Sequence, residues 1–172
     1  MALQTSGAIS FANLQTEFGG SNPITMGEYA AFRVSGSGNT ISMNQFYGAA
    51  GTDTQTVTIG RYYDGTAYIP TDNYGFSLTF GGGFGSISDG TLSLTGNTTI
   101  KDIRWNNLTP SIFLQLSGIV PNSGWTTMTI AGSALSRSSA SFSQSSGITS
   151  WQWTSANYFG TTIGATKSVV FT

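Results

Sequence analysis

Apolar residues alternate with polar ones over most of the chain beyond residue 51. A period of two places successive side chains on opposite faces of a strand, so the pattern predicts strands with one buried face. Turn signals rich in Gly, Asn and Asp separate these segments. About eight short strands at this spacing predict a mainly β fold, an antiparallel β-sandwich of immunoglobulin-like or jelly-roll type, with a small barrel as the alternative. The alternating sets are Val57/Ile59, Phe76/Leu78/Phe80, Leu92/Leu94, Ile112/Leu114/Leu116, Met128/Ile130, Trp151/Trp153 and Val169/Phe171.

Two Asp-Gly pairs lie where tight turns are expected. Asp64-Gly65 follows a pair of tyrosines, and Asp89-Gly90 lies between Ile87 and Leu92. Each pair predicts a hairpin, because Asp and Gly tolerate the positive φ angles of two-residue turns. Strand character continues over residues 167–172, so the C-terminal segment is expected to pair in a sheet, and its removal is expected to damage the fold.

A different pattern fills the first fifty residues, where one phrase occurs three times. It begins with Ile, continues with Ser or Thr, and has an apolar residue at the fourth position of the helix that would follow: 9–14, 24–29 and 41–46. Ser and Thr cap helix N-termini, and the preceding Ile can pack on the fourth helical residue as a hydrophobic staple. Thr25-Glu28 and Ser42-Gln45 also have the spacing of a capping box. Three short helices are predicted.

These helices are too short to be stable alone in water, so their apolar faces must be buried in this chain or in a partner. Gly19 and Gly48 are placed to end the first and third helices. Residues 33–40 form a Gly- and Ser-rich linker. We expect a helical attachment module over residues 1–50 and a β-sandwich domain over 51–172. The candidate assembly-interface residues are Phe11, Leu14, Phe18, Tyr29, Phe32, Phe46 and Tyr47.

Charged residues are scarce. Six Lys and Arg face seven Asp and Glu, for a net charge of −1, and only Lys101 and Lys167 are lysines. Soluble β proteins commonly protect their sheet edges with charge, so we expect neighbouring subunits to cover the edges in a homo-oligomer or larger particle. A monomer with short edge strands is the alternative. The scattered basic residues predict no nucleic-acid partner, and no apolar run reaches the roughly 20 residues of a membrane span.

The chain has no histidine and no cysteine. Serine triads, imidazole metal sites, disulfides and thiolate chemistry are therefore excluded. A pair of carboxylates remains chemically conceivable, but most of the aspartates occur beside turn residues, where they cap the backbone. We therefore predict no enzymatic activity, no cofactor and no metal site.

Two further features have structural explanations. Asp102 lies two residues before Arg104 in a predicted strand, and an exposed ion pair between them contributes about 0–1 kcal/mol. The glycine-rich run 81–85 lacks the Lys-Ser or Lys-Thr of a phosphate loop, so it predicts a hairpin tip or a close approach of another backbone.

Trp151 and Trp153 lie two residues apart and share one face of a strand. With Tyr62, Tyr63 or Tyr158 they could form a platform for sugar rings. The alternative, which the general behaviour of large aromatic residues favours, is that this face packs in the core.

The run from Ile9 to Gly51 is more specific than its composition. It contains Glu17-Phe18-Gly19-Gly20-Ser21, Pro23-Ile24-Thr25-Met26, Glu28-Tyr29 and Ile41-Ser42-Met43-Asn44-Gln45-Phe46-Tyr47-Gly48-Ala49-Ala50. This run resembles the N-terminal segment of tailed-bacteriophage minor tail or fibre-associated virion proteins. The stretches 123–130, 151–153 and 159–166 look like a small β domain of such proteins.

The resemblance implies a virion structural protein of the tail, baseplate or fibre apparatus, made in the host cytoplasm and located in the virion. Its N-terminal segment would attach to other virion proteins, and its β domain would serve subunit assembly or host adhesion. Cyclic homo-oligomers such as trimers are implied as well. A carbohydrate-binding adhesin that recognises a host surface glycan, and a capsid decoration protein, are the alternatives.

Overall fold

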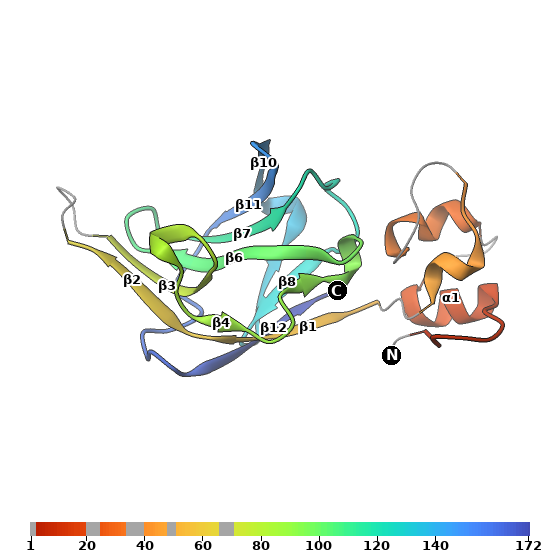
Figure 1. The fold of residues 1–172 in the computed structure, drawn as a ribbon, viewed down its shortest axis with the longest axis horizontal. Coiled ribbons are helices and arrows are strands. Elements are labelled where there is room, and N and C mark those ends of the chain that lie inside the picture. Colours follow the sequence, from red (N-terminus) through yellow and green to blue (C-terminus); the bar gives the residue numbers. More distant parts are fainter. Residues whose placement is uncertain (1–2, 20–24, 34–39, 48–50, 66–70) are drawn as a thin grey trace.

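The computed structural model describes residues 3–19, 25–33, 40–47, 51–65 and 71–172. It is a mainly β protein with two antiparallel sheets and a group of short helices at one end (Figure 1). One sheet has the order β4 (Ser86–Ile87), β1 (Asp53–Thr58), β12 (Thr166–Phe171), β8 (Thr127–Ile130) and β9 (Ser133–Ser136). The other has the order β10 (Ser141–Ser145), β11 (Ile148–Thr154), β7 (Ser111–Ser117), β6 (Thr98–Asn106), β3 (Thr71–Ser77) and β2 (Gly60–Asp64), and β5 (Thr91–Leu92) also pairs with β6.

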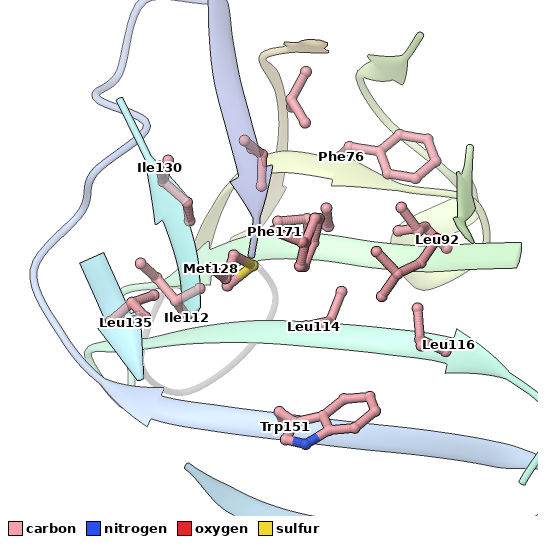
Figure 2. Packing of buried hydrophobic residues seen from close by; sticks show 14 of the residues in the cluster. Phe76, Leu92, Ile112, Leu114, Leu116, Met128, Ile130, Leu135, Trp151 and Phe171 are labelled. Atoms are coloured by element: carbon pink, nitrogen blue, oxygen red, sulfur yellow. The ribbon is translucent and has the colours of Figure 1, made fainter. Parts of the chain in front are cut away.

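The predicted sandwich is confirmed, because one hydrophobic cluster lies between the two sheets. Phe171 of β12 and Met128 of β8 contribute from the five-stranded sheet, and Leu114 of β7 and Trp151 of β11 contribute from the seven-stranded sheet (Figure 2). Each of these side chains is at or near 0% exposed. Strand alternation along the sequence thus supplies both inner faces of the core.

The C-terminal strand β12 lies in the middle of its sheet. It pairs with β1 on one side, where Asp53 lies opposite Phe171, and with β8 on the other, where Ile130 lies opposite Val169. The predicted pairing of the C-terminal segment is therefore confirmed, and β12 joins the first strand of the sandwich to a strand formed more than sixty residues later.

The hairpin predicted at Asp64-Gly65 is present, because β2 and β3 pair antiparallel, but its connection is longer than two residues, and the hairpin predicted at Asp89-Gly90 is wrong. Strand β2 ends at Asp64, which lies opposite Thr71, so the connection spans residues 65–70, of which 66–70 lie outside the described residues. Around Asp89-Gly90 the chain crosses between sheets, because β4 pairs with β1 whereas β5 pairs with β6. The Oε1 atom of Gln55 accepts the N–H groups of Asp89 and Gly90, at 3.2 and 3.3 Å, and so holds the crossing segment on β1.

The predicted strand through Phe76, Leu78 and Phe80 ends early. The Ser77 hydroxyl accepts the N–H of Phe80 at 3.0 Å and turns the chain into a short 3-10 helix, η3 (Phe80–Gly82). Gly81 has a φ of +60°, and a Cβ atom there would overlap the Tyr62 ring. The glycine run therefore folds back on the sheet, where a side chain would not fit. Leu94 is also outside a strand and is buried in η4 (Ser93–Thr95).

The N-terminal phrases form helices as predicted, in α1 (Phe11–Phe18) and the 3-10 helices η1 (Met26–Phe32) and η2 (Met43–Phe46). Another 3-10 turn, η5 (Arg137–Ser139), follows β9.

The caps differ in part from the prediction. Ser10 and Asn13 form a capping box in which each backbone N–H donates to the other side chain, at 2.8 and 3.2 Å. Ser42 N–H donates to Gln45 Oε1 at 3.0 Å, whereas the Thr25 side chain makes no capping hydrogen bond. In α1, Asn13 therefore occupies the capping-box position at which Glu or Gln was expected.

Gly19 ends α1 with a φ of +74°, and its N–H donates to Gln15 O at 2.9 Å. This outcome matches the prediction. Gly48, and residues 34–39 of the linker predicted over 33–40, lie outside the described residues.

Replacing Phe171 with Ala is expected to lower the free energy of unfolding by about 3–5 kcal/mol, because the change leaves a cavity between the sheets beside Trp125, whose ring centre lies 5.5 Å away. Chemical denaturation followed by tryptophan fluorescence measures the change. Leu108→Ala is the control, since Leu108 is 50% exposed and its truncation should have little effect. Equal losses in the two variants would contradict this assignment of the core.

Candidate functional site

The predicted assembly-interface residues mostly pack on one another within this chain. Leu14, Tyr29 and Phe46 are buried in a second hydrophobic cluster that involves only residues of the N-terminal segment, whereas Phe11 is 40% exposed. The remaining three residues of the predicted set are partly buried against this cluster: Phe18, Phe32 and Tyr47. The apolar faces are thus covered within the chain, and Phe11 alone among these seven keeps a large exposed area.

The helical segment also contacts the end of the sandwich. Phe32 stacks on Phe18 with ring centres 4.4 Å apart, and it packs against both hydrophobic clusters. The Glu17 side chain accepts the N–H of Gly51 at 2.9 Å. A hollow of about 250 Å³ lies at this junction, with Trp125 and Arg137 among its lining residues.

Trp151 and Trp153 lie in the sandwich core, which was the favoured alternative. Their indole N–H groups donate to Asn122 Oδ1 at 2.8 Å and to Ser136 O at 2.7 Å. Trp125 contacts both indoles, with ring centres 5.5 and 6.2 Å away. Both indoles are almost fully buried, so they offer no face to a sugar ring.

The tyrosines of the predicted sugar platform are not brought to the tryptophans. Tyr62 and Tyr63 lie on β2, at the opposite edge of the seven-stranded sheet from β11. Tyr62 packs instead on Phe80, and Tyr158 is partly buried against the core.

Trp151→Ala is expected to lower the free energy of unfolding by about 3–5 kcal/mol, since the indole fills the core and its N–H is hydrogen-bonded. Thermal or chemical denaturation measures the effect. Tyr63→Ala serves as the control, because that side chain is 51% exposed. A Trp151 variant with unchanged stability would show that the indole is not a core residue.

A buried polar cluster on the outer face of the seven-stranded sheet is the feature that sequence reasoning underestimated. Arg104 Nε donates to Asp102 Oδ2 at 2.6 Å, and both side chains are less than a tenth exposed. Arg104 Nη1 donates to Asn73 Oδ1, which also accepts from Asn106 Nδ2, at 2.7 and 2.9 Å. Because this ion pair is buried, the small value expected for an exposed pair does not apply, and removal of one partner typically costs about 3–5 kcal/mol.

Two aromatic rings cover the guanidinium. The Arg104 Cζ atom lies 4.0 Å from the ring centre of Phe80 and 4.5 Å from that of Phe113. Phe80 comes from η3, so the glycine-rich run places a ring over the ion pair. No signal in the sequence foretold this, since Phe80 lies more than twenty residues from Arg104.

Burial raises the pKa of Asp102 to about 7, although the charge and hydrogen bond of Arg104 and a hydrogen bond with Ser77 lower it in part. The Oδ1 atom of Asp102 has no hydrogen-bond partner among the described residues. An ionised carboxylate with one unpaired oxygen is costly in this environment, so Asp102 keeps its proton up to about pH 7 and forms a charged pair with Arg104 above that pH.

The stability of the protein is therefore expected to fall as the pH rises from about 4 to about 7. Over this interval the folded state holds a proton on Asp102 that the unfolded state, with the ordinary pKa of 3.8, has lost, so ionisation favours unfolding. Above pH 7 Asp102 is ionised in both the folded and the unfolded state, so it no longer makes the stability depend on pH. Asp102→Asn should flatten the dependence of the melting temperature on pH, whereas Asp89→Asn, which removes an exposed turn carboxylate, should keep it. Identical slopes in wild type and Asp102→Asn would contradict the assignment.

One flank of the sandwich is almost free of charge. Between Arg104 and Lys167 the only charged residue is Arg137. Its Nη1 atom donates to Asn122 Oδ1 at 2.8 Å, and its Nε atom donates to the Trp125 carbonyl, so this cation is held within the chain. The strands β7 to β11 all come from this stretch.

Strand β10 is the exposed edge of this flank, and we call residues 141–145 the β10 edge. All five residues are exposed, and the strand pairs with β11 alone among the described strands. The sequence Ser141-Phe142-Ser143-Gln144-Ser145 has no charge. It also has a single apolar residue, so the alternation that predicts strands elsewhere in the chain is missing from it.

A polar hollow of about 370 Å³ adjoins the β10 edge, where the chain turns from β9 toward β11. Its lining residues are mostly small or polar: Ala134, Leu135, Ser136, Ser139, Ser141, Gln152, Trp153 and Thr154. These residues lack groups that act as general acids or bases, so the hollow offers contacts and no acid–base chemistry.

Within the described ranges, no group of three or more acidic residues is placed to hold a metal ion. In the same ranges, none of the helices has the length and hydropathy needed to cross a membrane.

The chain matches no protein-family model, no curated protein and no solved structure.

Proposed function

We propose that this protein is a structural component of a tailed-bacteriophage particle, in its tail, baseplate or fibre apparatus. In this role the β-sandwich is the body of the subunit, and the N-terminal segment attaches it to other virion proteins. The subunits would be held together by the surface that they bury against one another, and the role involves no catalysis.

The observation that carries the proposal is the uncharged flank with its β10 edge. An exposed edge strand presents unpaired backbone N–H and C=O groups, and proteins that stay monomeric commonly protect such strands with lysine, proline or a covering loop. The β10 edge contains neither lysine nor proline. A subunit that is packed against neighbours in a particle needs no such protection.

The N-terminal segment supports the same proposal. Its helices have a small core of their own and contact the end of the sandwich through Phe32 and Glu17. The segment therefore presents a formed surface, including the exposed ring of Phe11, and does not need a partner in order to cover its apolar faces. We therefore expect attachment through the exposed surface of this segment, and not through the apolar helix faces, which are buried within the chain.

The adhesin alternative loses the platform on which it was based, because Trp151 and Trp153 are core residues. No observation in the described structure favours the capsid decoration alternative over the tail.

The test is to purify phage particles from lysates of a host that carries this gene, and to identify their proteins by mass spectrometry. We expect peptides of this chain to band with the particles in a density gradient and to remain after a high-salt wash. Immuno-electron microscopy with an antibody against the full chain should label the tail end. Loss of the peptides with the soluble proteins would overturn the proposal, and labelling of the head would support the decoration alternative instead.

A further inference from the structure

We propose that the β10 edge pairs with the β10 edge of a second copy of this chain, antiparallel and about a twofold axis at Ser143. The inference rests on the proposed function and names one contact by which the subunits would assemble. In the pair the two seven-stranded sheets become one continuous sheet.

Strand β10 is open along its free edge and on the face that carries its serines. It is the terminal strand of its sheet, with β11 as its neighbour, and all five of its residues are exposed. On the other face Phe142 packs on Trp151, and Gln144 Nε2 donates to Val120 O at 2.5 Å. In Figure 1 the strand stands at the upper margin of the molecule, away from the helices. A second chain can therefore approach its free edge.

The sequence of β10 is self-complementary in an antiparallel pair. Antiparallel pairing about Ser143 places Ser141 opposite Ser145 of the second copy, and Phe142 opposite its Gln144. Residues opposite one another in an antiparallel pair point to the same face, so serines lie among serines on one face of the joined sheet. A shift by one residue would put Phe142 on the serine face, and a shift by two keeps the faces but pairs fewer of the five residues of β10, so the axis at Ser143 is favoured.

The exposed phenyl ring of Phe142 also favours this pair. Phe142 packs on Trp151, with ring centres 5.4 Å apart, yet it remains 37% exposed. Gln144 of the second copy, whose Nε2 atom donates to Val120 O of its own chain, would lie opposite this ring, and its methylene groups would cover the free side. Such burial of apolar area favours association, and the contact needs no charged partner.

The other sheet edges fit this partner less well. The opposite edge strand, β2, carries Arg61 and Asp64, and Arg61 forms an ion pair with Asp72 at 2.7 Å. In the five-stranded sheet, edge strand β4 has two residues and edge strand β9 has four. Uncharged pairing over five residues is available at β10, and an isologous contact of this kind closes as a dimer.

The absence of native cysteine makes single-cysteine cross-linking a direct test. In the full-length chain, Ser143→Cys is expected to give a disulfide-linked dimer as the main product of mild oxidation, because the two Cβ atoms would face one another across the axis. Thr161→Cys, in an exposed loop, is the matched control and should give only traces at the same concentration.

The register has its own test. A mixture of Ser141→Cys and Ser145→Cys chains, one of them carrying a tag that changes its size, should cross-link mainly between the two variants. Each variant alone should cross-link poorly, since residue 141 lies about 13 Å from its own copy in the proposed pair, too far for a disulfide.

A charge at the axis should separate the pair. Ser143→Lys places two like charges opposite one another, so cross-linking through Ser145→Cys with Ser141→Cys should fall at least tenfold in this background. The melting temperature should stay unchanged, because residue 143 is exposed in the single chain. Cross-linking of Ser143→Cys no greater than that of Thr161→Cys, or insensitivity to Ser143→Lys, would overturn the proposal.

This outcome is separable from that of the proposed function. A chain that bands with phage particles but fails to cross-link at residue 143 would leave the virion role standing and remove the β10 contact. A chain that cross-links as expected but is absent from particles would remove the virion role and leave the β10 contact standing.

Discussion

The packing of Trp125 against aromatic residues from both sheets is the contact on which the sandwich depends. This indole lies in the connection before β8 and contacts Trp151 and Trp153 of one sheet and Phe171 of the other. Large aromatic rings in edge-to-face contact bury much area and fix a specific geometry. Because β12 carries Phe171 and pairs with β1, the same contact holds the strand that follows the helical segment.

Uncharged side chains satisfy much of the loop backbone in this protein. Gln55 accepts the N–H groups of a crossing segment, and the Thr149 hydroxyl accepts from Val120 N–H and donates to Gly118 O, each at 2.9 Å. Side-chain hydroxyls and amides can serve as both donors and acceptors, so they satisfy loop backbone without adding charge. Asp102 and Arg104 form a buried charged pair, and Phe80 and Phe113 cover the guanidinium.

This chemistry favours assembly. A surface of serine, threonine and glutamine gives little long-range repulsion between copies, so contacts are decided by shape and by hydrogen bonding at short range. The charges of the sandwich are concentrated around β2, β3 and β6. On the flank that ends at β10, the charged side chain among the described residues is Arg137, and it is hydrogen-bonded within the chain. The two sides of the sandwich are thus suited to different environments.

The sequence by itself determined the features that depend on neighbouring residues. Ser10 and Gly19 mark the start and end of a helix through local hydrogen bonds, and the period of two around Ile112 and Val169 defines strands with one inner face. Tertiary structure alone decided which strands pair, since Asp89-Gly90 looks like a hairpin but leads from one sheet to the other. It also decided that Phe80 covers Arg104 and that the tryptophan face lies in the core. Strand pairing and side-chain burial depend on contacts with residues distant in the sequence. The alternation of apolar and polar residues along a strand is the same whichever sheet or helix packs on its apolar face, so it does not identify that neighbour.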